Sequence, residues 1–244
     1  NNASVTSPAP TITVTPGPFS LAKSIVTLSP ASIPSGNATT VTLQAKDAAG
    51  NNHTTGGLTV TFALGSGSGA QGTFDAVVDN GDGTYTATFT GILAGKNTIT
   101  ATIDGAAVTS KAPSVTVTPG PFSLANSIVT LSSGSIASAS KSTITLQARD
   151  AAGNNLTTGG LTVAFALGSG SGAQGTFSAV TDKKNGTFTA TFTGTIAGDN
   201  TITATINGSP VTSTAPSITV TPGPFSVANS VVFLAPTSIP LGGS

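Results

Sequence analysis

The chain has 244 residues, a mass of 23.5 kDa, and 8 basic against 8 acidic residues, so its formal net charge is zero. It has no Cys and a single His, which excludes disulfides, thiolate nucleophiles and zinc sites built from thiolates or several imidazoles. A neutral chain has no field to attract nucleic acid or an anionic membrane, and no run approaches the roughly 20 apolar residues that span a bilayer.

The sequence is an internal repeat with a period of 103 residues. The string TPGPFS begins at Thr15, Thr118 and Thr221, and 26 of 103 positions differ when 19–121 is laid over 122–224. No signal peptide opens the chain, so we expect a mature chain or a fragment. We predict four parts: the tail, with the last strand, of a preceding repeat (1–18), two whole repeats (19–121, core about 24–118; 122–224, core about 127–221) and the first strand of a following repeat (225–244).

Within each repeat, apolar residues alternate with Thr and other polar residues. In the first repeat these runs are 41–45, 58–64, 85–89, 99–103 and 115–117. A period of two is typical of strands with one buried and one wet face, and Gly-, Asn- and Pro-rich turns separate the runs. About seven short strands per repeat predict an all-β fold of tandem immunoglobulin-like antiparallel β-sandwiches in an elongated array.

The joint between repeats is a Pro-Gly-Pro-Phe segment that occurs three times. Proline fixes φ and resists collapse, so we predict a short, semi-stiff connector and therefore a rod. The Phe beside each joint either plugs the end of its own domain or wedges between neighbours. The predicted interdomain linker residues are Pro16, Gly17, Pro18, Phe19, Pro119, Gly120, Pro121, Phe122, Pro222, Gly223, Pro224 and Phe225.

Comparison of the two copies tests each chemical motif, because a site that every repeat needs should occur in both. The segment 79–83 (DNGDG) resembles a fragment of a calcium loop, but its counterpart 182–186 (DKKNG) has two cations where Ca²⁺ needs oxygens. A tight turn between strands is the favoured interpretation. The Gly-rich run 65–72 lacks the Lys and the helix of a phosphate-binding loop and is predicted to be a flexible connection between strands.

The remaining candidates for chemistry also differ between copies. His53 becomes Leu156, as expected for a partly buried loop contact, and Tyr85 becomes Phe188, as expected for a core aromatic. No Lys is common to both repeats, which argues against a repeated isopeptide crosslink. We therefore predict no catalytic, cofactor-binding or metal-binding residue and no cofactor.

Several segments resemble a known family. The runs 24–36, 41–51 (VTLQAKDAAGN) and 58–62 resemble the bacterial immunoglobulin-like repeats of the invasin/intimin adhesins, and 79–89 (DNGDGTYTATF) is similar to a stretch of filamin-type repeats. The resemblance covers both whole repeats and both partial ends. It implies a β-sandwich fold and an extracellular, cell-surface protein whose repeats hold an adhesive tip away from the cell.

These observations predict a structural, non-enzymatic stalk or spacer of a large cell-surface adhesin. The alternative is a repeat of a self-associating extracellular filament, because the Thr-rich faces carry little charge to block strand addition at sheet edges. A module that binds a ligand through its loops is a third possibility. The expected partners are neighbouring repeats of the same chain and, for the filament, other copies laterally, with no nucleic acid, no direct membrane insertion and an unknown receptor.

Overall fold

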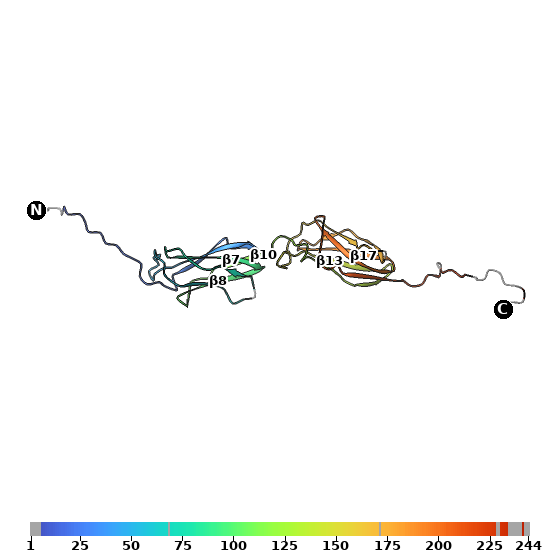
Figure 1. Ribbon diagram of the computed structural model, residues 1–244, viewed down its shortest axis with the longest axis horizontal. Coiled ribbons are helices and arrows are strands. Elements are labelled where there is room, and N and C mark those ends of the chain that lie inside the picture. The colour runs from blue at the N-terminus through green and yellow to red at the C-terminus, as the bar shows by residue number, and fades with distance from the viewer. Residues whose placement is uncertain (1–5, 68, 171, 228–229, 234–240, 242–244) are drawn as a thin grey trace. The chain divides into compact units, whose positions relative to one another are not determined.

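The computed structural model describes all residues except 1–5, 68, 171, 228–229, 234–240 and 242–244. Every extended regular element in this part of the chain is a β-strand (Figure 1). Over the same residues, no helix is both long and apolar enough to cross a bilayer. The predicted all-β fold of tandem sandwiches is confirmed.

The first repeat forms ten strands, which we call the first sandwich. Seven of them have four residues or more, in agreement with the predicted number of about seven, and five of these lie over the alternating runs. The other three are pieces of two or three residues, too short for a period of two to show. The strands are β1 (Ile25–Ser29), β2 (Ser32–Pro34), β3 (Ala38–Gln44), β4 (Val60–Leu64), β5 (Gln71–Phe74), β6 (Val78–Asp79), β7 (Thr84–Leu93), β8 (Gly95–Ile103), β9 (Ala106–Ala107) and β10 (Ser114–Thr118).

The second repeat forms an equivalent set, the second sandwich. Its strands are β11 (Ile128–Leu131), β12 (Ser135–Ala137), β13 (Lys141–Gln147), β14 (Val163–Leu167), β15 (Gln174–Phe177), β16 (Thr181–Asp182), β17 (Thr187–Ile196), β18 (Gly198–Ile206), β19 (Ser209–Pro210) and β20 (Ser217–Thr221). The two sets follow each other in the same order because the sequences share three quarters of their positions.

Each sandwich has two sheets. In the first, one sheet has the order β1-β3-β7-β5 with β6 beside β7, and the other has the order β2-β10-β8-β4 with β9 beside β8. All pairs are antiparallel except β2 with β10. The second sandwich has the same topology in β11–β20. The β7–β8 connection therefore passes from one sheet to the other.

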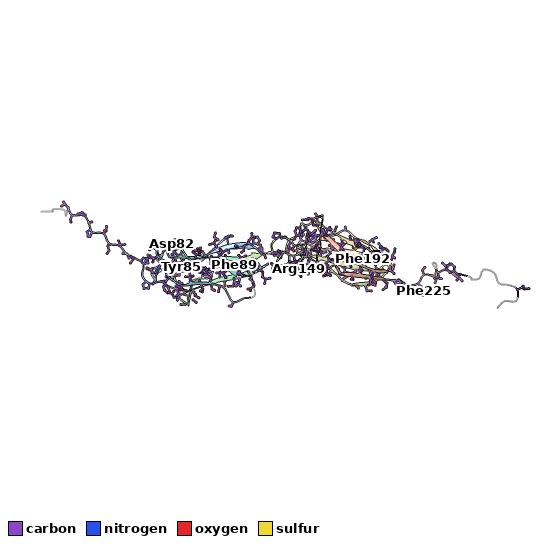
Figure 2. The ribbon with its side chains drawn as sticks, viewed as in Figure 1. Asp82, Tyr85, Phe89, Arg149, Phe192 and Phe225 are labelled. Carbon is purple, nitrogen blue, oxygen red and sulfur yellow. The ribbon has the colours of Figure 1, made fainter. Side chains whose placement is uncertain are left out.

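The alternating residues form the core between the sheets. In β7, the even-numbered Thr positions are half-buried, whereas Tyr85, Ala87, Phe89 and Gly91 are buried. The second core uses the matching positions, and Phe188 and Phe192 are buried there as Tyr85 and Phe89 are in the first core. Figure 2 labels Tyr85 and Phe89 in the first sandwich and Phe192 in the second. Burial of each such aromatic or aliphatic side chain contributes about 1.5–3 kcal/mol, and these cores need no disulfide.

The Gly-rich run 65–72 is shaped by close packing. A Cβ on Gly72 would lie 2.2 Å from the Thr90 carbonyl oxygen and 2.6 Å from Cζ of Phe89. The same holds for Gly175 against Thr193 and the Phe192 ring. The predicted flexible connection is therefore shorter than expected, because β5 already begins at Gln71 and its glycine admits a core aromatic ring.

The chain divides into two compact units that do not coincide with the repeats. The first comprises 1–126 and 148–157, and the second comprises 127–147 and 158–244. The segment 148–157, which we call the DAAGNN loop of the second repeat, thus packs with the first unit. The DAAGNN loop of the first repeat is the equivalent segment 45–54.

The two partial ends form no strand in the described residues. Residues 6–18 and 225–227, 230–233 and 241 lack regular structure, and the remainder of 225–244 and residues 1–5 lie outside the described part. Their assignment to a preceding and a following repeat, like the repeat boundaries at 19–121 and 122–224, stays a prediction.

Candidate functional site

The Pro-Gly-Pro part of the linker offers a single backbone donor. In Pro16-Gly17-Pro18 and again in Pro119-Gly120-Pro121, both prolines lack an N–H, so the glycine carries the only one. Gly17 is exposed and Gly120 is half-buried, and the N–H of each has an acceptor within the protein. In both copies the acceptor is a carboxylate that lies 30 residues further along the chain.

In the first repeat that carboxylate belongs to Asp47. Its Oδ2 accepts hydrogen bonds from the Gly17 N–H at 3.1 Å and from Nδ2 of Asn51 at 2.9 Å, and its Oδ1 accepts one from the Asn51 N–H at 2.9 Å. The aspartate is 5% exposed. We call Gly17, Asp47 and Asn51 the first linker clamp.

The second linker clamp consists of Gly120, Asp150 and Asn154. Oδ2 of Asp150 accepts from the Gly120 N–H at 2.9 Å and from Nδ2 of Asn154 at 2.8 Å. Oδ1 accepts from the N–H groups of Asn154 and Ala152 at 2.8 and 2.9 Å. Asp150 is 1% exposed and accepts four hydrogen bonds, which is close to the full capacity of a carboxylate.

These hydrogen bonds keep both carboxyl groups ionised. Donation from the Asn51 side chain, then from the N–H groups of Asn51 and Gly17, lowers the pKa of Asp47 to about 2. Burial alone would raise the pKa of Asp150, but its bonds from Asn154, Gly120 and Ala152 outweigh burial, so the pKa of Asp150 is lowered too. A carboxylate at neutral pH is a stronger acceptor than a neutral group.

Backbone hydrogen bonds also hold the residues that flank the second Pro-Gly-Pro segment. The carbonyl of Thr118 accepts from the Ser35 N–H at 2.8 Å, and the Ser123 N–H donates to the Arg149 carbonyl at 2.6 Å. Hydrogen bonds therefore hold the linker at the Thr118 carbonyl, at the Gly120 N–H and at the Ser123 N–H. At the third linker, the Thr221 carbonyl accepts from Ser138 in the same way, again at 2.8 Å.

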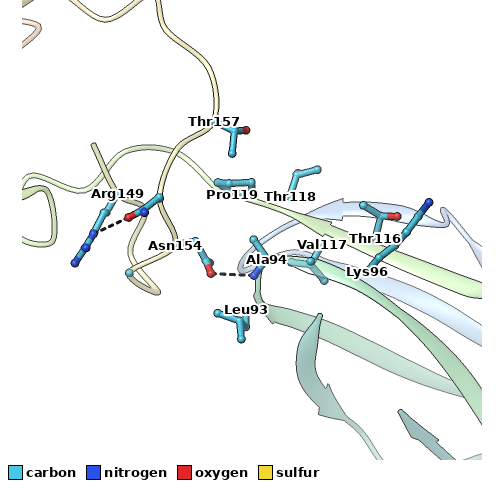
Figure 3. Close-up of a pocket in the computed structure, with 13 residues that line it drawn as sticks. Leu93, Ala94, Lys96, Thr116, Val117, Thr118, Pro119, Arg149, Asn154 and Thr157 are labelled. Carbon is cyan, nitrogen blue, oxygen red and sulfur yellow. Dashed lines mark hydrogen bonds between the residues drawn. The ribbon is translucent and has the colours of Figure 1, made fainter. Parts of the chain in front are cut away.

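The Asn154 amide extends the second clamp to the β7–β8 corner, which we define as residues 92–95. Its Nδ2 donates to the Ile92 carbonyl at 2.8 Å, and its Oδ1 accepts from the Ala94 N–H at 2.9 Å (Figure 3). Asn154 is only 6% exposed as a result. One side chain thus joins the linker aspartate to the end of β7.

The linker phenylalanines differ in their surroundings. Phe19 is half-buried and packs against the core of the first sandwich, so at this joint it plugs the end of its own domain. Phe122 is half-buried beside Asp150, and Phe225 is 87% exposed among the described residues (Figure 2). The first of the two predicted roles therefore describes Phe19.

Two cavities flank the second clamp. One, of about 810 Å³, lies between the β7–β8 corner, the end of β10 and the DAAGNN loop of the second repeat, with Lys96 and Arg149 in its lining (Figure 3). The other, of about 450 Å³, is lined by Ile92, Pro121 and Phe122 among others. Both cavities border the second linker and the DAAGNN loop of the second repeat, so both belong to the surroundings of the second linker clamp.

The segment 79–83 is the turn between β6 and β7, as predicted. Asp79 accepts from the N–H groups of Gly57 and Gly81 at 2.7 and 2.9 Å, and Asp82 accepts from the Thr84 N–H at 2.9 Å. Asp182 makes the equivalent bonds in the second copy. Within the described residues, no three His, Cys, Asp or Glu side chains gather as metal ligands do. The carboxylates here close loops.

The His and Tyr singled out in the sequence are structural in the first sandwich. His53 is half-buried, and its N–H donates to the Ala45 carbonyl at 2.9 Å, a bond that Leu156 repeats with Ala148. Tyr85 is 1% exposed and its hydroxyl accepts from the Leu58 N–H at 3.1 Å. Burial, more than the neighbouring Asp79 and Asp104, raises the pKa of Tyr85.

Sequence reasoning had not linked Asp47 and Asp150 to the linker. DAAGNN was visible as a repeated turn, but its contact with a glycine 30 residues away depends on the tertiary fold. Two features of the sequence pointed to this contact. The aspartate and the asparagine of the clamp are identical in the two copies, and each Pro-Gly-Pro segment has one N–H that needs an acceptor.

The fold and the sequence comparisons together define tandem bacterial immunoglobulin-like repeats of the invasin/intimin adhesin type. The sequence matches invasin domain 3 twice, over residues 20–120 and 123–223. The chain therefore belongs to the invasin domain 3 family.

Solved structures agree with this assignment. A solved structure of the Escherichia coli adhesin FdeC is 32% identical, with a TM-score of 0.57, over 87% of this chain and 68% of the chain in that structure. Invasin, a bacterial integrin-binding protein, is 27% identical, with a TM-score of 0.52, over 84% of this chain. The chain spans only 41% of that invasin structure. No curated protein sequence matches the chain.

Proposed function

We propose that this chain is a non-enzymatic spacer segment of a cell-surface adhesin, in which the repeats hold a binding domain at a distance. The observation that carries the proposal is that in the first two Pro-Gly-Pro linkers the only N–H donates to the aspartate of the following repeat. A spacer must resist collapse, and a linker fixed by proline and hydrogen bonds resists it better than a Gly/Ser linker.

The adhesin family supports a role at the cell surface. FdeC is an adhesin and invasin is integrin-binding, and in our proposal this chain contributes the distance between the cell and such a binding domain. The low charge of the chain suits that role, because electrostatic repulsion between repeats, and hence their spacing, changes little with salt.

The use of the carboxylates supports a role without catalysis. Asp47, Asp79, Asp150 and Asp182 all accept hydrogen bonds from backbone N–H groups. General acid–base catalysis needs a carboxyl group that is free to exchange a proton near the working pH. Lowered pKa values, as at Asp47 and Asp150, oppose that requirement.

Small-angle X-ray scattering of the whole chain tests the spacer. We expect an elongated particle in which each repeat adds roughly 35–45 Å, from strands of about seven residues at ~3.3 Å rise plus end loops. A globular profile with both repeats collapsed together would contradict the proposal.

The sheet edges favour a second candidate, a self-associating filament. The edge strands β4 (VTFAL) and β14 (VAFAL) carry no charged residue and no proline, and such edges accept strands from another molecule. Sedimentation velocity across a concentration series distinguishes the two. The filament predicts growing assemblies, and the spacer predicts a monomer at every concentration.

A further inference from the structure

The asparagine of the second linker clamp binds backbone groups of the β7–β8 corner and not its side chains. Asn154 contacts the Ile92 carbonyl and the Ala94 N–H, so its amide pairs with the β7–β8 corner as a peptide group would. One Nδ2 hydrogen goes to Asp150 and the other to Ile92, which uses both donors of the amide. Asp150 therefore presets the orientation in which Asn154 binds the corner.

The first linker clamp holds Asn51 in the same preset orientation. Its N–H and one Nδ2 hydrogen donate to Asp47, both at 2.9 Å. Among the described residues no donor reaches Asn51 Oδ1 and no second acceptor reaches its Nδ2, and the residue is exposed. The amide that Asn154 uses to bind a corner is thus available on Asn51.

The second sandwich carries the matching corner, residues 195–198 between β17 and β18. Ser138 Oγ donates to the Thr195 carbonyl at 3.0 Å, just as Ser35 Oγ donates to the Ile92 carbonyl at 2.7 Å. The Ile92 carbonyl accepts a second side-chain hydrogen bond from Asn154, whereas in the described part of the chain no asparagine side chain reaches the Thr195 carbonyl. Ala197 is exposed, whereas its counterpart Ala94 is half-buried.

We propose that Asn51 is a docking residue for the backbone of the β17–β18-type corner of a preceding repeat of this kind. The inference rests on the proposed spacer function, because it requires repeats in tandem. The side chains of the two corners differ, with Ile92 and Leu93 in one and Thr195 and Ile196 in the other. An asparagine amide that bonds only backbone groups can bind both corners, because the backbone groups are the same. A four-residue Thr-Pro-Gly-Pro connection gives the two surfaces the high effective concentration that two hydrogen bonds need.

An extended chain brings the two surfaces together. A copy of 122–224 is inserted between Pro18 and Phe19, which restores the same Thr-Pro-Gly-Pro-Phe joint ahead of Asn51. Amide hydrogen exchange by NMR then reports the Ala197 N–H of the inserted copy. We expect its exchange to be at least about tenfold slower than that of Ala197 in the second repeat of the same chain.

Asn51→Ala in the extended chain should abolish this protection, and Asn154→Ala is the matched control. The control should expose the Ala94 N–H and leave the inserted Ala197 protected. Unchanged exchange of the β3 amides verifies that each variant is folded. Equal exchange of the inserted Ala197 with and without Asn51 would overturn the proposal.

Two further outcomes separate the inference from its alternatives. Protection of Ala197 that appears in the unextended chain as concentration rises would assign the corner to a second molecule and overturn docking within one chain. An elongated scattering profile of the extended chain with an unprotected Ala197 would refute the docking residue alone. A collapsed profile would refute the spacer function itself.

Discussion

The two linker clamps have identical sequences and different surroundings. Both use the string DAAGNN, both capture the glycine N–H of Pro-Gly-Pro, and both orient an asparagine. Asn154 is 6% exposed because it binds the β7–β8 corner, whereas Asn51 is exposed. The sequence of the loop therefore builds the hydrogen-bonding geometry, and what the loop binds determines its burial.

The largest difference between the clamps should appear on removing the aspartate. Asp150→Ala leaves four donors without their acceptor in a site that is 1% exposed, which we expect to cost about 2–4 kcal/mol. Asp47→Ala removes three bonds and should cost less. Urea unfolding followed by far-UV circular dichroism, which reports the strands of both sandwiches, measures both losses. Equal losses would show that burial of the second clamp contributes nothing.

Acid should weaken both clamps together. The pKa of Asp47 is lowered to about 2, and those of Asp82, Asp150 and Asp182 are lowered as well. A carboxyl whose folded pKa lies below its unfolded value of about 3.9 stabilises the fold above that value and loses the effect as pH falls toward the folded pKa.

We therefore expect a constant free energy of unfolding from about pH 7 to 5 and a decline from about pH 4 to 2. Asp47→Asn should flatten part of this decline, because the amide does not titrate. Urea titrations at half-unit pH steps measure the profile. A stability that rises on acidification below pH 4 would contradict the assigned role of these carboxylates.

The two linker glycines should respond to alanine with opposite signs. A Cβ on Gly120 would lie 2.9 Å from the Ser35 carbonyl oxygen, whereas on Gly17 its nearest neighbours are 4.0 Å away. Gly120→Ala should therefore cost about 1–2 kcal/mol through overpacking. Gly17→Ala should be neutral or stabilising by up to about 1 kcal/mol, because alanine restricts the unfolded chain. Thermal unfolding of both variants checks the sign, and equal effects would contradict the contact with Ser35.

The period-two pattern and the internal repeat were sufficient to predict the fold and the main strands. Val41, Leu43, Phe89 and Ile99, read as inward-facing, are all buried. The short strands β2, β6 and β9 were not predicted, because two or three residues carry no period. The beginning of β5 was also missed, since Gly72 appears as a flexible residue and its packing against Phe89 depends on the fold.

The linker was predicted only in part. The prolines indicated stiffness, and Phe19 was correctly considered as a plug of its own domain. The hydrogen bonds that anchor Gly17 and Gly120 join residues 30 positions apart, and the bonds of Asn154 span about 60. Local propensity does not report such long-range contacts, whereas identity between two copies of a repeat does point to the residues that make them.

The central claim is that the second linker clamp holds the Gly120 N–H of the Pro-Gly-Pro linker against the Asp150 carboxylate. Amide hydrogen exchange by NMR tests this bond directly, because Gly120 carries the only N–H between Pro119 and Pro121. We expect slow exchange of the Gly120 N–H that becomes fast in Asp150→Ala and stays slow in the control Asp47→Ala. Fast exchange of Gly120 in the parent chain, or exchange that Asp150→Ala leaves unchanged, would contradict the claim.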